Sequence, residues 1–174
     1  MGFFYCSESK KEEVAAMPFV AQHFIRTRDI HLYASPDRVF PLFDPLGEKR
    51  WADGWEPETI YPASGEVEEG MVFTTGSHDE VQAIWTMLAF NAERWRISYL
   101  RVTPGSHVAR IDIHCEDNLD ETTRASISYT FTALTEQGND YVARFTEEHY
   151  QEWMSSWEKA INYYLRHGHP LQHH

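Results

Sequence analysis

The sequence has few features that would tie it to secretion or to a membrane. Only two cysteines, Cys6 and Cys115, occur in 174 residues, which is far below the density of a disulfide scaffold. No Asn-x-Ser/Thr sequon is present, and no apolar run approaches the roughly 20 residues of a membrane span. The apolar stretch 2–6 is too short for a signal peptide and is followed by a polar segment. We therefore predict a cytoplasmic protein without a membrane span.

Basic residues are also scarce, and the sequence motifs of common cofactor sites are missing. Lys and Arg number 15 against 27 Asp and Glu, a net charge of −12 that does not favour binding to nucleic acid. Neither Gly-x-Gly-x-x-Gly nor Gly-Lys-Ser/Thr occurs, and there is no Gly-x-Ser-x-Gly nucleophile elbow. Cys-x-x-Cys and His-Glu-x-x-His are absent too. We expect no cofactor, no metal site and no nucleic-acid partner.

Aromatic residues, in contrast, are abundant. Ten Phe, nine Tyr and six Trp nearly equal Leu, Ile and Val taken together. A core so rich in rings is either a bulky, closely packed core or one that encloses a ring-lined cavity.

The alternation of apolar and polar residues predicts a sheet. A first strand is expected within 20–33, and six more follow at 59–61, 71–75, 82–90, 95–102, 108–116 and 123–134. Ser35-Pro36-Asp37 starts a helix after the first strand, and Pro41 and Pro45 keep the helices there short. In the last strand Ala125 through Ala133 alternate cleanly, as in a half-buried antiparallel strand.

Towards the C-terminus the apolar period changes to that of a helix. Residues 138–166 predict either one helix of about 28 residues or two helices that break near Thr146. Gly168 and Pro170 end it. We assign 1–17 to a peripheral leader, 18–168 to a single domain and 169–174 to a His-rich tail. Successive strands before a terminal helix predict an α+β fold with the helix on one face of the sheet.

This order of elements resembles the helix-grip fold of the START-like, or SRPBCC, superfamily, which includes polyketide cyclase/dehydrase-like bacterial proteins. The resemblance covers roughly residues 19–168. Its carriers are Ala34-Ser35-Pro36-x-x-Val39-Phe40, Trp51-x-x-Gly54-Trp55-x-Pro57, Gly70-x-Val72-Phe73 and the stretch Tyr129–Asn139. It implies a curved antiparallel sheet of about seven strands wrapped on a long C-terminal helix, with two short helices after the first strand. It also implies a cavity between sheet and helix, but no shared catalytic residue.

With that fold, one set of residues is expected to line the cavity. These candidate ligand-binding residues are Trp95, Tyr99, Tyr129, Phe131, Phe145, His149, Trp153 and Trp157. Trp51 and Trp55, with Gly54 between them, form either a cover over the cavity mouth or a hydrophobic plug that fixes a long connection.

His149 lies on the apolar stripe of the terminal helix, so two interpretations are open. It is either a core histidine bonded within the protein or a cavity residue that bonds a ligand or serves as a general base. The main functional hypothesis is the binding, for transport or sequestration, of a small apolar, ring-containing molecule. The alternatives are a cyclase, dehydratase or hydrolase that uses His149 with Tyr129 or Tyr99, and an accessory protein that acts through its surface.

Overall fold

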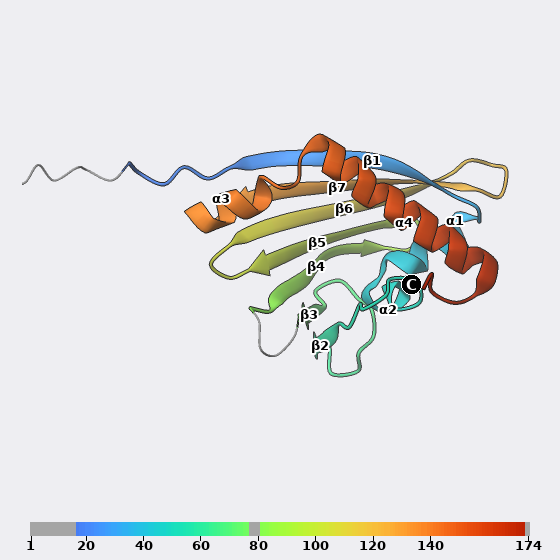
Figure 1. Ribbon diagram of the computed structural model, residues 1–174. Helices are drawn as coiled ribbons and strands as arrows, with labels where there is room; N and C mark the ends of the chain where they lie inside the picture. Colours follow the sequence, from blue (N-terminus) through green and yellow to red (C-terminus); the bar gives the residue numbers. More distant parts are fainter. Residues whose placement is uncertain (1–16, 77–80, 173–174) are drawn as a thin grey trace, which may run out of the picture.

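The computed structural model describes residues 17–76 and 81–172, and in them seven strands form one antiparallel sheet (Figure 1). The strands are β1 (His23–Leu32), β2 (Glu58–Tyr61), β3 (Val72–Thr75), β4 (Ala83–Asn91), β5 (Arg96–Thr103), β6 (His107–Asp117) and β7 (Thr123–Ala133). Their order is β1-β7-β6-β5-β4-β3-β2. The predicted fold class is confirmed. Most of the predicted leader, residues 1–16, and the last two residues of the predicted tail lie outside the described residues.

Short helical segments connect β1 to β2, as the prolines predicted. They are α1 (Pro36–Val39), the 3₁₀ turn η1 (Phe40–Phe43) and α2 (Pro45–Glu48). Each begins with a proline at its first or second position, which fixes φ and removes a donor that the previous turn would need. The prediction of two short α-helices after the first strand is confirmed, with the 3₁₀ turn between them.

The C-terminal helical region is broken, which decides between the two alternatives. It consists of α3 (Glu136–Val142) and α4 (Glu147–His167). The Thr146 hydroxyl accepts a hydrogen bond from the backbone N–H of His149 at 3.2 Å and so caps α4. Gly168 adopts φ 75° and ends the helix. No helix among the described residues is long and apolar enough to cross a membrane.

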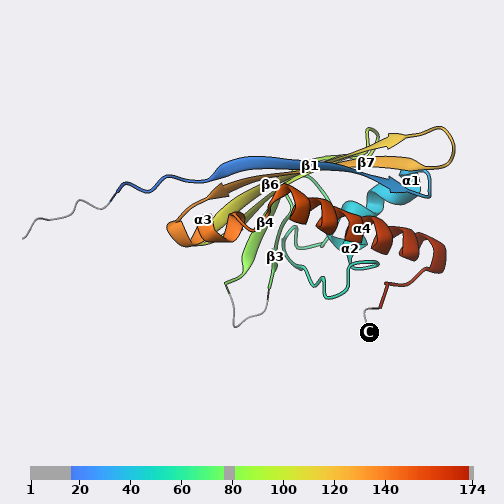
Figure 2. The same ribbon diagram turned by 45° about the horizontal axis from the view of Figure 1, so that its top comes forward.

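The helices cover one face of the sheet, and the core lies between them (Figure 2). Along β7 every second residue from Ala125 to Ala133 is buried, and the residues between them are partly exposed. The predicted alternation is therefore confirmed. Where α4 crosses β7, the buried Tyr150 hydroxyl donates to the Ile127 carbonyl at 2.8 Å.

Polar side chains of α4 attach the helix to the outer edge of β1, which pairs with no strand of the described residues other than β7. The His31 N–H donates to the Glu158 carboxylate at 2.7 Å, and the Tyr33 N–H donates to the Asn162 amide oxygen at 2.9 Å. The Asn162 amide nitrogen donates in turn to the His31 carbonyl at 2.9 Å. These bonds satisfy edge groups that could otherwise pair with another strand, and they fix the helix along the edge of the sheet.

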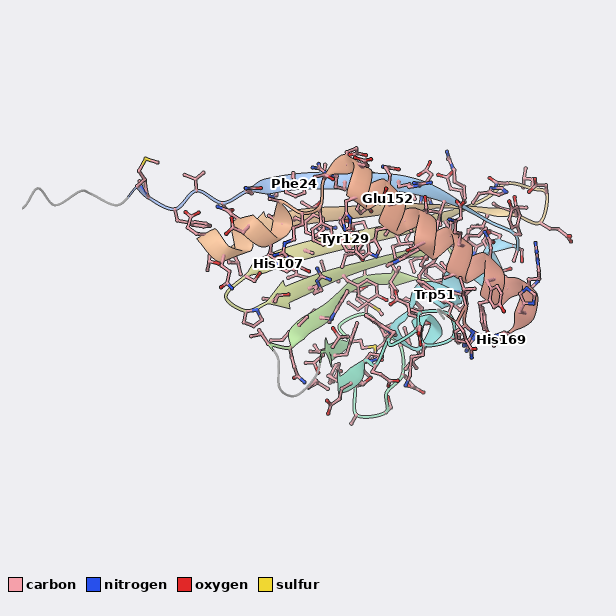
Figure 3. The ribbon with its side chains drawn as sticks, in the orientation of Figure 1. Phe24, Trp51, His107, Tyr129, Glu152 and His169 are labelled. Carbon is pink, nitrogen blue, oxygen red and sulfur yellow. The ribbon has the colours of Figure 1, made fainter. Side chains whose placement is uncertain are left out.

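This attachment predicts a measurable difference between two glutamates of α4. Glu158→Ala removes the acceptor for the His31 N–H, so we expect the free energy of unfolding to fall by about 0.5–1.5 kcal/mol. Glu152 is exposed on the same helix and is labelled in Figure 3. Its side chain makes no hydrogen bond or ion pair with a described residue, so Glu152→Ala is the matched control. Urea midpoints of both variants provide the comparison. Equal midpoints would show that the edge contact adds no stability.

Candidate functional site

A cavity of about 240 Å³ lies between the sheet and α4. Its walls come from α2, the segment after α2, the five strands from β3 to β7, and α4. The lining residues are Pro45, Glu48, Trp51, Ala52, Asp53, Gly54, Trp55, Phe73, Trp85, Tyr99, Arg101, Ile111, Ile113, Tyr129, Trp153 and Trp157. In Figure 3, Tyr129 lies on the sheet near the N-terminal half of α4, and Trp51 lies near the C-terminal half.

The strand register arranges the floor of the cavity in rows. Phe73 pairs with Trp85, which pairs with Arg101 on β5. In the next row, Tyr99 on β5 pairs with Ile111 on β6, and Ile111 pairs with Tyr129 on β7. Residues of one row point to the same face because side chains alternate along a strand. The floor is therefore a surface of rings and aliphatic groups that contains one cation.

Two tryptophans of α4 form the opposite wall. Trp153 and Trp157 are one helical turn apart, with ring centroids 5.7 Å from each other. Trp153 meets the Tyr129 ring edge-on at 4.9 Å, and Trp157 meets the Trp51 ring at 5.3 Å. Edge-to-face contacts of this kind are favourable for aromatic pairs and hold the walls in place.

The segment that carries Trp51 and Trp55 is anchored to the body of the protein. The Trp51 indole N–H donates to the Leu42 carbonyl at 2.8 Å, and the Trp55 indole N–H donates to the Pro45 carbonyl at 2.9 Å. Trp51 is only 4% exposed. Both indoles line the cavity while they are bonded to α2 and η1. The segment therefore lines the cavity, as a cover would, and is also bonded to the helices before it, as a plug that fixes the connection would be.

Helix α2 brings an acid to the cavity. The Asp44 carboxylate caps this helix by accepting from the N–H groups of Leu46 and Gly47 at 2.9 and 2.6 Å. Gly47 is so close to η1 that an added Cβ would lie 1.7 Å from the Pro41 carbonyl oxygen. Only glycine at position 47 allows α2 to pack this closely against η1. The next residue, Glu48, then lines the cavity.

The carboxyl group of Glu48 has no compensating partner. Its side chain makes no hydrogen bond or ion pair with any residue in 17–76 or 81–172. Burial raises the pKa of Glu48 well above its usual value, and the nearby Asp44 carboxylate raises it further. A carboxyl group in this state is a proton donor when neutral and a base when ionised, so it can exchange a proton with a bound molecule.

Two tyrosines differ in how their hydroxyl groups are used. The Tyr99 hydroxyl donates to the Phe43 carbonyl at 2.9 Å, whereas the Tyr129 hydroxyl has no hydrogen-bond partner among the described residues. Burial raises the pKa of both hydroxyls above the ordinary value, so both groups stay protonated at neutral pH. Tyr129 thus supplies a free donor and acceptor to the cavity that it lines.

Six of the residues predicted from sequence line the cavity together: Tyr99, Tyr129, Trp153, Trp157, Trp51 and Trp55. Phe131 and Phe145 do not. Their rings stack on each other at 4.5 Å beside the cavity, and Phe131 is fully buried. Phe131 lies on β7 and Phe145 in the link between α3 and α4, and neither residue lines the cavity.

Trp95 and His149 lie elsewhere, which corrects two expectations. Trp95 precedes β5 with φ 50°, and this turn conformation directs its indole N–H to the Asp37 carboxylate at 3.1 Å. His149 is exposed in the first turn of α4, about 100° around the helix from the buried Tyr150. Because the helix begins only after Thr146, the stripe that faces the sheet contains Tyr150 and not His149.

Several lining residues were not predicted from the sequence. Trp85 alternates with the buried Met87, which was a usable signal for an inward-facing ring. Arg101 falls on the same face of β5 as Ile97 and Tyr99, and a charge at an inward position is itself informative. Glu48 gave no such signal, because its helix is too short to show a period.

Solved structures provide a comparison for this geometry. The Mll3558 protein of Rhizobium loti matches with a TM-score of 0.58 and 20% identity, over 82% of this chain and 99% of that chain. Norcoclaurine synthase from Thalictrum flavum, in complex with dopamine and hydroxybenzaldehyde, matches with a TM-score of 0.59 and 12% identity, over 96% and 98%. The ZhuI aromatase/cyclase from a Streptomyces species matches with a TM-score of 0.57 and 14% identity, over 87% and 100%.

The protein has the helix-grip fold. The likeness extends over nearly the whole length of these structures, so the resemblance to the START-like or SRPBCC superfamily is confirmed at the level of the fold. No protein-family model matches the chain, and a search of curated proteins found no match. The shared helix-grip fold alone does not assign a ligand or a reaction.

The raised pKa of Glu48 predicts how stability depends on pH. The unfolded chain ionises Glu48 near its ordinary value of about 4.3, whereas the folded protein holds the proton to higher pH. The unfolded state is therefore favoured increasingly as pH rises between the two pKa values. Glu48→Gln removes this effect. The free energy of unfolding of the variant, relative to that of wild type, should therefore increase from pH 5 to pH 8.

Urea unfolding at several pH values measures this difference, with the exposed Glu152→Gln as the control for loss of a carboxylate. A difference between Glu48→Gln and wild type that stays constant with pH would contradict a raised pKa of the half-buried Glu48 carboxyl group.

Proposed function

We propose that the protein binds a small ring-containing molecule in the cavity between the sheet and α4. The proposal is based on a cavity of about 240 Å³ in which eight of the sixteen lining residues are aromatic and a few polar groups face inward. Predominantly apolar walls with few polar groups are typical of small-molecule sites.

The volume limits the size of the ligand. An engineered apolar cavity of roughly 150 Å³ binds benzene, and pockets for drug-sized molecules begin near about 300 Å³. The cavity of 240 Å³ therefore suits one substituted ring or two fused rings. That the related norcoclaurine synthase fold holds dopamine and hydroxybenzaldehyde, two single-ring molecules, supports this class of ligand.

The alternative hypothesis, an enzyme that uses His149 as its base, has no support from the position of that residue. His149 is exposed and does not line the cavity, so it does not meet Tyr129 or Tyr99 there. Binding is the function that the remaining geometry favours, because rings enclose the space and Tyr129 offers a free hydroxyl within it.

The test compares two isoleucines, of which only one lines the cavity. Ile111 is 2% exposed and lies in the floor of the cavity, whereas Ile127 is fully buried and is not part of the lining. In Ile111→Phe the larger ring extends into empty space, so we expect a stability loss below about 1 kcal/mol. In Ile127→Phe it overpacks the core and should cost about 1–3 kcal/mol.

The effects on ligand affinity should be the reverse of the effects on stability: Ile111→Phe should lose affinity, and Ile127→Phe should keep it. The probe is 2-naphthol, and its affinity is measured by isothermal titration calorimetry. Ile111→Phe should lower this affinity at least about tenfold, which corresponds to about 1.4 kcal/mol of binding free energy. Ile127→Phe should bind as wild type does at a temperature where it is folded. If 2-naphthol binds equally to wild type and Ile111→Phe, the cavity is not the binding site.

A further inference from the structure

Arg101 is an unusual residue for the floor of an aromatic cavity. It occupies an inward position of β5, directly opposite Trp85 on β4, and its guanidinium carbon lies 5.3 Å from the centre of a Trp85 ring. A cation on an apolar face loses part of its hydration, and a contact with an anion in good geometry offsets this cost.

A neutral histidine holds the guanidinium in place. The Nη2 group of Arg101 donates to His107 Nε2 at 3.1 Å. Since arginine can only donate, Nε2 must accept, and the ring proton is on Nδ1, from which it is donated to the Ser106 hydroxyl at 2.9 Å. His107 is 2% exposed and stacks on the Tyr141 ring at 4.4 Å.

The histidine leaves the positive charge of Arg101 uncompensated. Burial, and secondly the Arg101 cation, lower the pKa of His107 to about 4, so the imidazole is neutral. In Figure 3, His107 lies at the end of the sheet near α3, farther from Trp51 than Tyr129 is. His107 is therefore a positioning residue that fixes the guanidinium at one end of the floor without adding charge.

No anion of the described residues meets this cation. Within 17–76 and 81–172, no carboxylate lies within 4 Å of Arg101, and its Nε is buried without a hydrogen-bond partner. The other charged residues that line the cavity are Glu48 and Asp53, and neither forms an ion pair with Arg101. The guanidinium is thus held in place, partly desolvated and not paired with an anion of residues 17–76 or 81–172.

We propose that the ring-containing ligand carries a carboxylate that pairs with Arg101, so that the ligand class is a one- or two-ring aromatic carboxylic acid. The inference rests on the proposed binding function and adds the charge of the ligand to it. The planar guanidinium matches the geometry of a carboxylate. A phosphate would need more than the one cation that lines the cavity, and an ammonium group placed at Arg101 would meet a like charge.

The experiment measures the affinity of the full chain for three matched probes by calorimetry at pH 7. They are 2-naphthoate, the neutral 2-naphthamide and the cationic 2-naphthylmethylammonium. Wild type should bind the naphthoate at least about 10-fold more tightly than the amide, as expected for hydrogen bonds to a charged group. The ammonium probe should bind most weakly.

Arg101→Met should lower the affinity for the naphthoate about 10- to 100-fold and leave that for the amide nearly unchanged. Arg144, an exposed arginine whose guanidinium carbon lies 5.9 Å from the centre of the Tyr141 ring, is the matched control. Arg144→Met should bind all three probes as wild type does.

The outcomes separate this inference from the function on which it rests. If wild type binds the naphthoate and the amide equally, or binds the ammonium most tightly, the carboxylate assignment is wrong while ring binding stands. This comparison needs no variant, so it holds even if Arg101→Met fails to fold. If none of the three probes binds wild type, the proposed binding function itself is overturned.

Discussion

The position of the cavity follows from the attachment of α4 to the outer edge of β1. Side chains of Glu158 and Asn162 satisfy the backbone groups of the edge strand, so the helix lies along one side of the sheet. The Tyr150 hydroxyl adds a fixed point on β7. From this position the largest side chains of the helix, Trp153 and Trp157, extend to the cavity. A cavity remains where the rings do not fill the distance between helix and sheet.

The residues around that cavity carry a cost that packing alone does not explain. A closely packed core would place aliphatic groups at positions 48 and 101. The cavity is instead lined there by a carboxyl group and a guanidinium that form no ion pair with any residue in 17–76 or 81–172. Neighbouring residues are arranged to hold both groups: Asp44 and Gly47 position Glu48, and His107 positions Arg101. Groups that are fixed and unpaired are features of sites in which a ligand completes the interactions.

The sequence predicted the sheet and the helices well because their periods are long and regular. The alternation through Ala125–Ala133 and the helix end at Gly168 are local signals, and the structure has them where they were expected. The break near Thr146 was one of two alternatives, between which the structure decides. The site was predicted only in part. The wall tryptophans were found from the helix period, but His149 was misplaced because one residue on a helix is a rotation of about 100°. Glu48 depends on a contact between Gly47 and Pro41 that no periodic pattern encodes.

If the space between the sheet and α4 binds a ring, an aromatic probe will be found there. Diffraction from crystals soaked with 2-bromonaphthalene tests this, because the anomalous signal of bromine locates the probe without reference to any other property. We expect a bromine peak inside the cavity, among the rings of Trp51, Tyr129 and Trp157. Bromine peaks found only on the outer surface, with none between the sheet and α4, would contradict it.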